Sequence, residues 1–215
     1  MEDKVTDYFV EKVPTNAVED FIRKYHYSRS IRGLHISFCF GLFTPNGKFG
    51  IPTLIGSMMF GIPAMAGVAE SYMPEEPKSV IELNRLCCID GTPTNTESYF
   101  IGKAIRWIKQ HTDYKLILWI PPGFAHGFIA LSDSEVIYKA TNFIHLGMTS
   151  LSRALIADGE VYHARMLTKK SPKFENIRQR IKKGDENIWT EELPAKHIYV
   201  LPLNNKIKKR VLKNI

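Results

Sequence analysis

The sequence predicts an α/β fold, in which a mixed sheet is flanked by helices. Residues 16–25 and 96–110 place apolar side chains on one face at helical spacing, and Thr94 and Glu97 have the spacing of a capping box before the second helix. Short apolar runs of strand length lie between and after these two segments. Helices and strands that alternate in this way are typical of a sheet covered by helices.

A hairpin is expected after the first helix. Residues 38–43 and 54–60 are apolar and aromatic runs, and a cluster of turn-forming residues follows the first run at Thr44-Pro45-Asn46-Gly47. A third strand over 80–88 follows a loop, 61–78, that is rich in proline, glycine, alanine and methionine.

The second half of the chain alternates in the same way. The hydrophobic run 114–120 is typical of a buried strand, and 136–146 is a candidate for the next strand. Residues 165–190 predict a basic helix, and 197–201 predict a last strand.

Composition excludes several classes of protein. The chain has 215 residues, of which 44% are hydrophobic and 24% charged, so it can bury a core. Its cysteines are Cys39, Cys87 and Cys88, an odd number without CxxC spacing, which disfavours a disulfide framework or a zinc site. There is no signal-peptide pattern and no apolar run long enough to cross a membrane. We therefore expect a cytoplasmic protein without a membrane partner.

Positive charge is concentrated at one end. Residues 1–159 carry 15 Lys and Arg against 16 Asp and Glu, whereas residues 160–215 carry 14 against 6. This division suggests a catalytic domain over 1–160 and a basic C-terminal extension over 161–215 that packs on it or extends it. Concentrated Lys and Arg favour a polyanionic partner, although a solvated basic tail would have the same composition.

Common catalytic signatures are absent, and three local clusters remain. The first, at 24–28, combines His26 with two tyrosines and a serine; histidine can move protons or bind a metal, although aromatic packing at a helix end would look the same. The second is the strand segment 82–86, and the third is the helix start at 95–98, where free N–H groups can bind an anion or can simply be capped.

Arg85 is the informative residue of the second cluster. Strict alternation along the strand puts Glu82 and Asn84 on one face, and Leu83 and Arg85 on the other. A strand arginine among apolar neighbours needs an anion or a carboxylate, because an unpaired buried charge is costly. A structural ion pair would also meet this need.

Six segments in the same order resemble the Mom family of phage DNA-modification proteins. They are 25–28, 39–43, 60–61, 82–85, 93–98 and 137–143. The resemblance implies a fold similar to the GNAT acyltransferases. It also implies an enzyme that adds a carbamoylmethyl-type group to the exocyclic amine of adenine in double-stranded DNA, in the host cell of a phage, and so blocks restriction enzymes.

The same resemblance assigns site residues. It makes His26 and Tyr27 candidates for metal contacts, with iron as the implied metal, and Arg85, Ser98 and Tyr138 candidates for the modification site. The acyl or amino-acid donor is left open, because no motif for acetyl-coenzyme A is found, and so is the oligomeric state. The chain departs from the family pattern over 119–135, where the family has a functional Asp and the acid nearest Tyr138 is Asp133.

That departing segment is itself similar to another family. Residues 120–128 with 138–142, together with 32–35, resemble the nucleotide-sugar 3,5-epimerases, which are cupin jelly rolls with a catalytic His, here His35. The helix expected over 96–110 disfavours a jelly roll. A catalytically inactive DNA-binding relative is a further alternative.

Overall fold

The structure is a computed structural model, and it describes residues 4–45, 50–63, 66–121, 137 and 140–213. Tyr138 and Asp133, and most of the departing segment 119–135, lie outside the described residues. None of the described helices is long and apolar enough to cross a membrane.

The chain divides into two compact units. The first draws on Met1–Ile120, Ile129–Leu146 and Ile198–Ile215, and the second draws on Pro121–Phe128 and Gly147–His197. These units do not coincide with the expected pieces 1–160 and 161–215. The difference arises because the last strand and the last helix of the chain return to the first unit.

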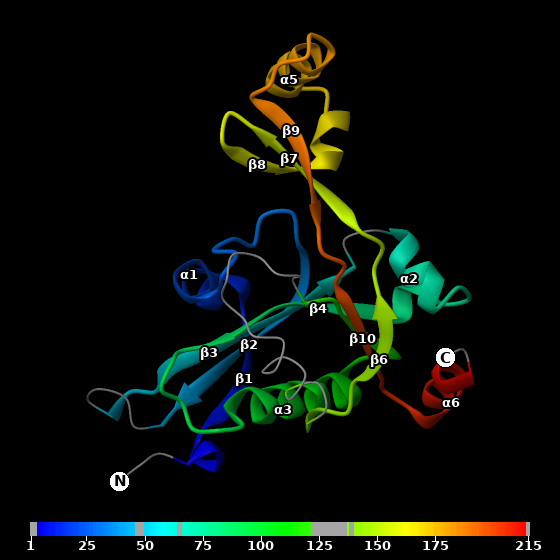
Figure 1. Cartoon of the computed structure of the whole chain (residues 1–215). Helices are drawn as coiled ribbons and strands as arrows, with labels where there is room; N and C mark the ends of the chain where they lie inside the picture. The colour runs from blue at the N-terminus through cyan, green and yellow to red at the C-terminus, as the bar shows by residue number, and fades with distance from the viewer. Residues whose placement is uncertain (1–3, 46–49, 64–65, 122–136, 138–139, 214–215) are drawn as a thin grey trace. The chain divides into compact units, whose positions relative to one another are not determined.

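The first unit is built on a mixed sheet, which confirms the expected fold class. Its seven described strands lie in the order β1-β2-β3-β4-β5-β10-β6 (Figure 1). Strands β4 and β5 are parallel, whereas the pairs β1–β2, β2–β3, β3–β4 and β5–β10 are antiparallel. The strands are β1 (Phe9–Val13), β2 (His35–Thr44), β3 (Thr53–Ile62), β4 (Val80–Cys88), β5 (Leu116–Trp119), β6 (Ile144–Met148) and β10 (His197–Pro202).

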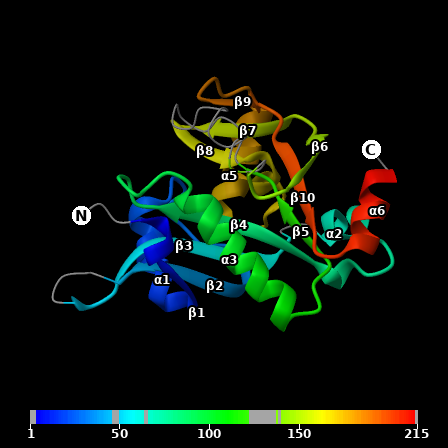
Figure 2. The same ribbon diagram turned by 90° about the horizontal axis from the view of Figure 1, so that it is seen from below.

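Helix α3 (Thr96–His111) covers one face of this sheet, here called the α3 face, which Figure 2 views from the helix side. Apolar residues recur along it at helical spacing and pack on β2, β3 and β4 through Phe100, Ile101, Ala104, Ile105 and Ile108. The expected capping pair Thr94–Glu97 is wrong. The N-cap is Asn95, at φ +69°, and its side chain makes no capping hydrogen bond.

The opposite face, here called the α1 face, is covered by three helices. Helix α1 (Thr15–Tyr25) buries Val18 and Ile22 against Cys39 and Met59 of the sheet. Helices α2 (Ala66–Tyr72) and α6 (Asn205–Lys213) pack farther along, over β4, β5 and β10. Short 3-10 helices, η1 (Val5–Asp7) and η3 (Pro77–Ser79), precede β1 and β4.

The second unit holds a small antiparallel sheet and a basic helix that is shorter than the expected 165–190, since β9 begins at Ile188. Strands β7 (Ser152–Ala157), β8 (Glu160–His163) and β9 (Ile188–Leu193) lie in the order β8-β7-β9, with η4 (Ala164–Thr168) and α5 (Pro172–Lys182) between β8 and β9. Leu155, Ala157, Phe174 and Ile177 form its core.

The strand expected over 136–146 is mostly wrong. Strand β6 begins only at Ile144, and the backbone N–H of Thr141 donates to the carbonyl of Ile137 at 3.1 Å, which is a helical turn. Apolar periodicity is a weak guide in so short a run.

Candidate functional site

The site begins where two neighbouring strands separate. Strands β4 and β5 pair only from Val80 to Glu82, with Glu82 opposite Leu118. Strand β4 then continues to Cys88, whereas β5 ends at Trp119. Within the described residues, β4 therefore has only β3 as a partner beyond Glu82. We call this point, where β4 and β5 stop pairing, the fork.

A β-bulge lies in β4 at the fork. Met59 pairs with Arg85 and the next residue, Phe60, pairs with Leu83, so Asn84 is an extra residue in β4. Leu83 packs with the α3 face, whereas Arg85 lies opposite Met59 on the α1 face. The bulge thus turns Arg85 to the opposite face from Leu83. The expectation of strict alternation is wrong here.

The bulge also brings together two charged residues that alternation would keep apart. Glu82 lies opposite Leu118, which packs on the α1 face. Arg85 is three residues later and shares that face because of the extra residue. The sequence prediction separated them.

Gly61 leaves room for the bulge. A Cβ atom on Gly61 would lie 2.5 Å from Oδ1 of Asn84 and 2.3 Å from the carbonyl oxygen of His35. Oδ1 of Asn84 is buried and has no hydrogen-bond partner. Sequence analysis missed this pair of residues, although a glycine inside a strand pattern is a known signal for a bulge.

Two neutral carbonyl groups hold the side chain of Arg85. Its Nε donates to the carbonyl of Ser30 at 3.1 Å, and its Nη1 donates to the carbonyl of Asn84 at 2.7 Å. No carboxylate of the described residues forms an ion pair with it. The structural ion pair that the sequence left open for Arg85 is therefore not found in the described part of the chain.

His26 ends α1 and is buried, with 5% of its surface exposed. Its Nδ1 accepts the backbone N–H of Ser28 at 3.1 Å and lies 2.8 Å from Oγ of Ser28. Burial, and then the nearby charge of Arg85, lower the pKa of His26 to about 4. The imidazole is therefore neutral at pH 7.

Tyr27 lies beside His26 and remains half exposed. The two ring centroids are 4.2 Å apart. Desolvation raises the pKa of the Tyr27 phenol, and the charge of Arg85 opposes this rise. Because Arg85 acts on both rings, the structure brings His26, Tyr27 and Arg85 into one neighbourhood.

The described hydrogen bond of Ser98 is confined to its own helix. The residue belongs to the first turn of α3, and its Oγ donates to the carbonyl of Asn95 at 3.0 Å. The described contacts do not join it to Arg85. Tyr138, the other expected member of the modification site, lies outside the described residues.

The described side chains do not form a metal site by themselves. No three His, Cys, Asp or Glu residues of the described part of the chain gather closely enough to hold an ion. Nδ1 of His26 already accepts a backbone N–H, and Arg85 places a positive charge nearby. The iron that the family resemblance implies stays a prediction.

The cysteines are not poised as nucleophiles. Burial raises the pKa of Cys87 to about 12, and it raises the pKa of Cys88 and of Cys39 as well. A reactive cysteine needs its thiolate form, which these environments disfavour.

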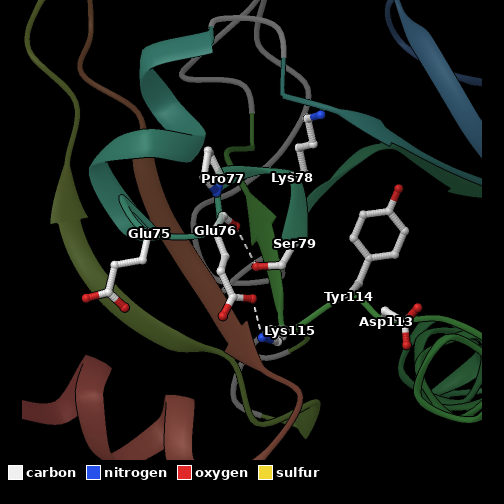
Figure 3. A pocket seen from close by; sticks show the side chains of 8 residues that line it. All are labelled: Glu75, Glu76, Pro77, Lys78, Ser79, Asp113, Tyr114 and Lys115. Carbon is white, nitrogen blue, oxygen red and sulfur yellow. Dashed lines mark hydrogen bonds and ion pairs between the residues drawn. The ribbon is translucent and has the colours of Figure 1, made fainter.

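A cleft of about 650 Å³ lies at the other end of β4 (Figure 3). Glu75, Glu76, Lys78, Asp113 and Lys115 are among the residues that line it. Glu76 pairs with Lys115 and its backbone carbonyl accepts the hydroxyl of Ser79, so these groups satisfy one another. We do not place the candidate site there.

A model of the Mom protein family matches residues 7–215. The solved structures that resemble this chain include the IAA acetyltransferase from Bacillus cereus, at 8% identity and a TM-score of 0.50, covering 91% of this chain and 99% of that one. They also include the ribosomal-protein-S5-alanine acetyltransferase from Vibrio fischeri, at 6% identity and a TM-score of 0.50, covering 95% and 97%. At such identity the likeness shows the fold alone, and it confirms the GNAT-like sheet flanked by helices.

A short stretch of the chain is similar to curated epimerases. It is 62% identical over 34 residues to dTDP-4-dehydrorhamnose 3,5-epimerase of Escherichia coli (strain K12), which is 15% of this chain and 18% of that protein. The enzyme of Salmonella typhimurium is 67% identical over 27 residues, 12% and 15% respectively. The chain thus spans less than a fifth of these relatives. The helix α3 between β4 and β5 does not belong to a jelly roll.

Proposed function

The chain belongs to the Mom protein family, and on that premise we propose that it is an enzyme that modifies adenine in phage DNA. The product carries a carbamoylmethyl-type group on the exocyclic amine and blocks restriction enzymes. The observation that carries the proposal is the bulge at Asn84, which turns Arg85 toward His26 and Tyr27 at the fork. A DNA-modifying transferase needs a place where a base and a group donor meet, and we place it at the fork because these three side chains gather there.

Each described residue of the site has a role that its contacts support. The adenine leaves the duplex to reach the fork, since its amine is otherwise held in the base stack. The half-exposed ring of Tyr27 can stack on it. As the amine nitrogen bonds to the transferred group, the bond between that group and the rest of the donor breaks and the donor remnant leaves with the electron pair. Glu82, on the same face as Arg85, can accept the proton that the amine loses. Ser98 and Tyr138 stay proposed members of the site.

Double-stranded DNA is the proposed partner, and basic residues of the first unit offer it a surface. A second cleft, of about 350 Å³, is lined by Lys109 of α3 and Lys208 of α6 with Asn142, Asn204 and Asn205. The residues lining this cleft include no acid. In the second unit, by contrast, Arg178, Arg180 and Lys173 pair with carboxylates. Uncompensated lysines favour phosphate contacts.

Mass spectrometry of nucleosides tests the proposal. DNA from cells that express the chain should contain a modified deoxyadenosine, and Arg85→Gln should abolish it because the substitution removes the uncompensated cation of the proposed site. Arg153→Gln is the matched control, because it removes an exposed arginine of the second unit that pairs with Glu192, and it should leave the product unchanged.

Unmodified deoxyadenosine in the presence of folded wild-type protein would contradict the proposal. If that protein still bound DNA in a salt-dependent way, it would be a catalytically inactive DNA-binding relative.

A further inference from the structure

We propose that His26 and Arg85 together bind a carboxylate of the group donor, and that His26 acts there as a hydrogen-bond donor and not as a metal ligand. The identity of the site rests on the proposed function. The contacts of these two residues indicate the chemical class of the ligand.

The contacts of His26 show which of its two ring nitrogens carries the proton. The backbone N–H of Ser28 points to Nδ1 at 3.1 Å, and an amide N–H can only donate. Nδ1 must therefore carry the lone pair. The proton of the neutral ring then lies on Nε2.

The second step is the direction of that N–H. Nε2 has no hydrogen-bond partner among the described residues. It is also not one of the buried unpaired atoms, which are Oγ of Ser57 and Oδ1 of Asn84. The side chain is almost wholly buried, but Nε2 is not completely inaccessible, and its N–H has no acceptor among the described residues. A metal at Nε2 would require the proton to move to Nδ1, where it would face the N–H of Ser28.

The positive charge of Arg85 has no carboxylate partner among the described residues. Its Nε and Nη1 are held by carbonyl groups, which fix the guanidinium plane without neutralising it. Its Nη2 has no partner among the described residues. A half-buried guanidinium held in this way is preorganised for a carboxylate, and it disfavours a metal cation nearby.

The last step is that one short segment holds both side chains. The carbonyl of Ser30 accepts from Nε of Arg85 and lies 3.2 Å from Oγ of Ser28, whose single hydroxyl proton donates instead to the bare Nδ1 of His26 at 2.8 Å. The segment 28–30 therefore links the imidazole to the guanidinium. The exposed groups on both are donors, and the complement of such a pair is an anion that accepts hydrogen bonds.

The proton position can be read directly by long-range ¹H–¹⁵N NMR of the full-length wild-type protein. We expect the His26 ring to show a bare Nδ1 and a protonated Nε2 at pH 7, unchanged when Fe²⁺ is added without oxygen. A protonated Nδ1, or selective broadening of the His26 signals by Fe²⁺, would overturn the proposal.

Binding of small probes tests the ligand class. In NMR titrations of the full-length protein, acetate and glycine should shift the His26 and Arg85 signals, whereas acetamide should bind about tenfold more weakly. His26→Phe, which keeps an aromatic ring without the N–H, should weaken acetate binding about tenfold, and His26→Gln should restore part of it through its amide donor. Arg85→Gln should abolish binding. The matched control is Arg106→Gln, which removes an exposed arginine of α3.

The outcomes separate this inference from the proposed function. Acetate binding at His26 and Arg85 without any modified nucleoside would leave the carboxylate site standing and remove the proposed reaction. A modified nucleoside together with equal binding of acetate and acetamide would support the proposed reaction and overturn the carboxylate site. If His26→Phe unfolds, the tautomer measurement on the wild-type protein still decides the proposal.

Discussion

The positive charge of Arg85 is uncompensated because the groups that hold its side chain are neutral carbonyls. The carbonyls of Ser30 and Asn84 take two of its nitrogens, and no described carboxylate answers its charge. The positive charge of Arg85 therefore helps to lower the pKa of His26, although burial is the larger cause of that shift. The chemistry of the site thus depends on a buried neutral imidazole beside an uncompensated cation.

The low pKa of His26 should make folding stability depend on pH. The folded pKa is about 4 against an ordinary value of 6.5, so between these values the unfolded chain binds more protons than the folded one. The contribution is complete above pH 6.5 and is lost as the pH falls toward 4. At pH 5 the loss should be about 2 kcal/mol.

Urea unfolding of the wild-type protein and of His26→Gln at pH 8 and pH 5 measures this loss, since the other titrating groups cancel in the difference. The wild-type protein should lose more stability than the variant on acidification. Equal losses would mean that His26 titrates normally in the folded protein.

Strand β4 shows what one inserted residue does to an element. Asn84 changes the face of every residue that follows it, so Arg85 and Cys87 lie on the α1 face while Leu86 and Cys88 pack on the α3 face. Gly61 makes the insertion possible, because a side chain there would collide with the backbone of His35. Gly61 of β3 and Asn84 of β4 therefore form the bulge together.

Gly61→Ala should disturb the bulge at Asn84. The added Cβ would lie 2.3 Å from a carbonyl oxygen, which cannot give way easily, and we expect a loss of about 1–3 kcal/mol in the free energy of unfolding. Acetate binding at Arg85 should weaken as well, because the bulge orients that residue.

Gly102→Ala is the matched control for this substitution. Gly102 lies on α3, and a Cβ atom added there would have nothing within 4 Å, so alanine at this position should stabilise the helix by roughly 0.5–1 kcal/mol. Chemical denaturation of both variants measures the two effects. A Gly61→Ala protein as stable as the wild type would show that the bulge does not depend on this glycine.

The charge of the whole chain looks different once the fold is known. The basic C-terminal quarter is not one extension, because its last helix, α6, packs on the first unit and the residues before β10 belong to the second. Many basic residues of the second unit are paired, whereas Lys109 and Lys208 line a cleft without acids. The net charge of the sequence therefore overstates the second unit as a DNA-binding surface.

Replacing Lys109 and Lys208 by Gln should weaken binding to duplex DNA and reduce the slope of log K against log salt by about two, since each phosphate contact contributes about 0.9. Fluorescence anisotropy across a salt series measures the slope. The control replaces Arg153 and Lys173 by Gln, which removes the same charge from residues paired with Glu192 and Glu160. Equal slopes for both double variants would show that only net charge matters.

The sequence by itself determined the kinds of element and their order. Helical spacing over 96–110 and apolar runs such as 114–120 appear in the structure as α3 and β5, because burial of a periodic apolar face is a local property of the chain. The clusters around His26 and Arg85 were also visible before any fold was known, since residues of that chemistry need partners.

Only the tertiary structure decided which way those residues face. The extra residue at Asn84 and the parallel start of β4 and β5 follow from hydrogen bonds between segments far apart in the chain, to which local periodicity is blind. The return of β10 to pair with β5 likewise reunites residues about 80 positions apart. Strand register, and not composition, therefore placed Arg85 beside His26.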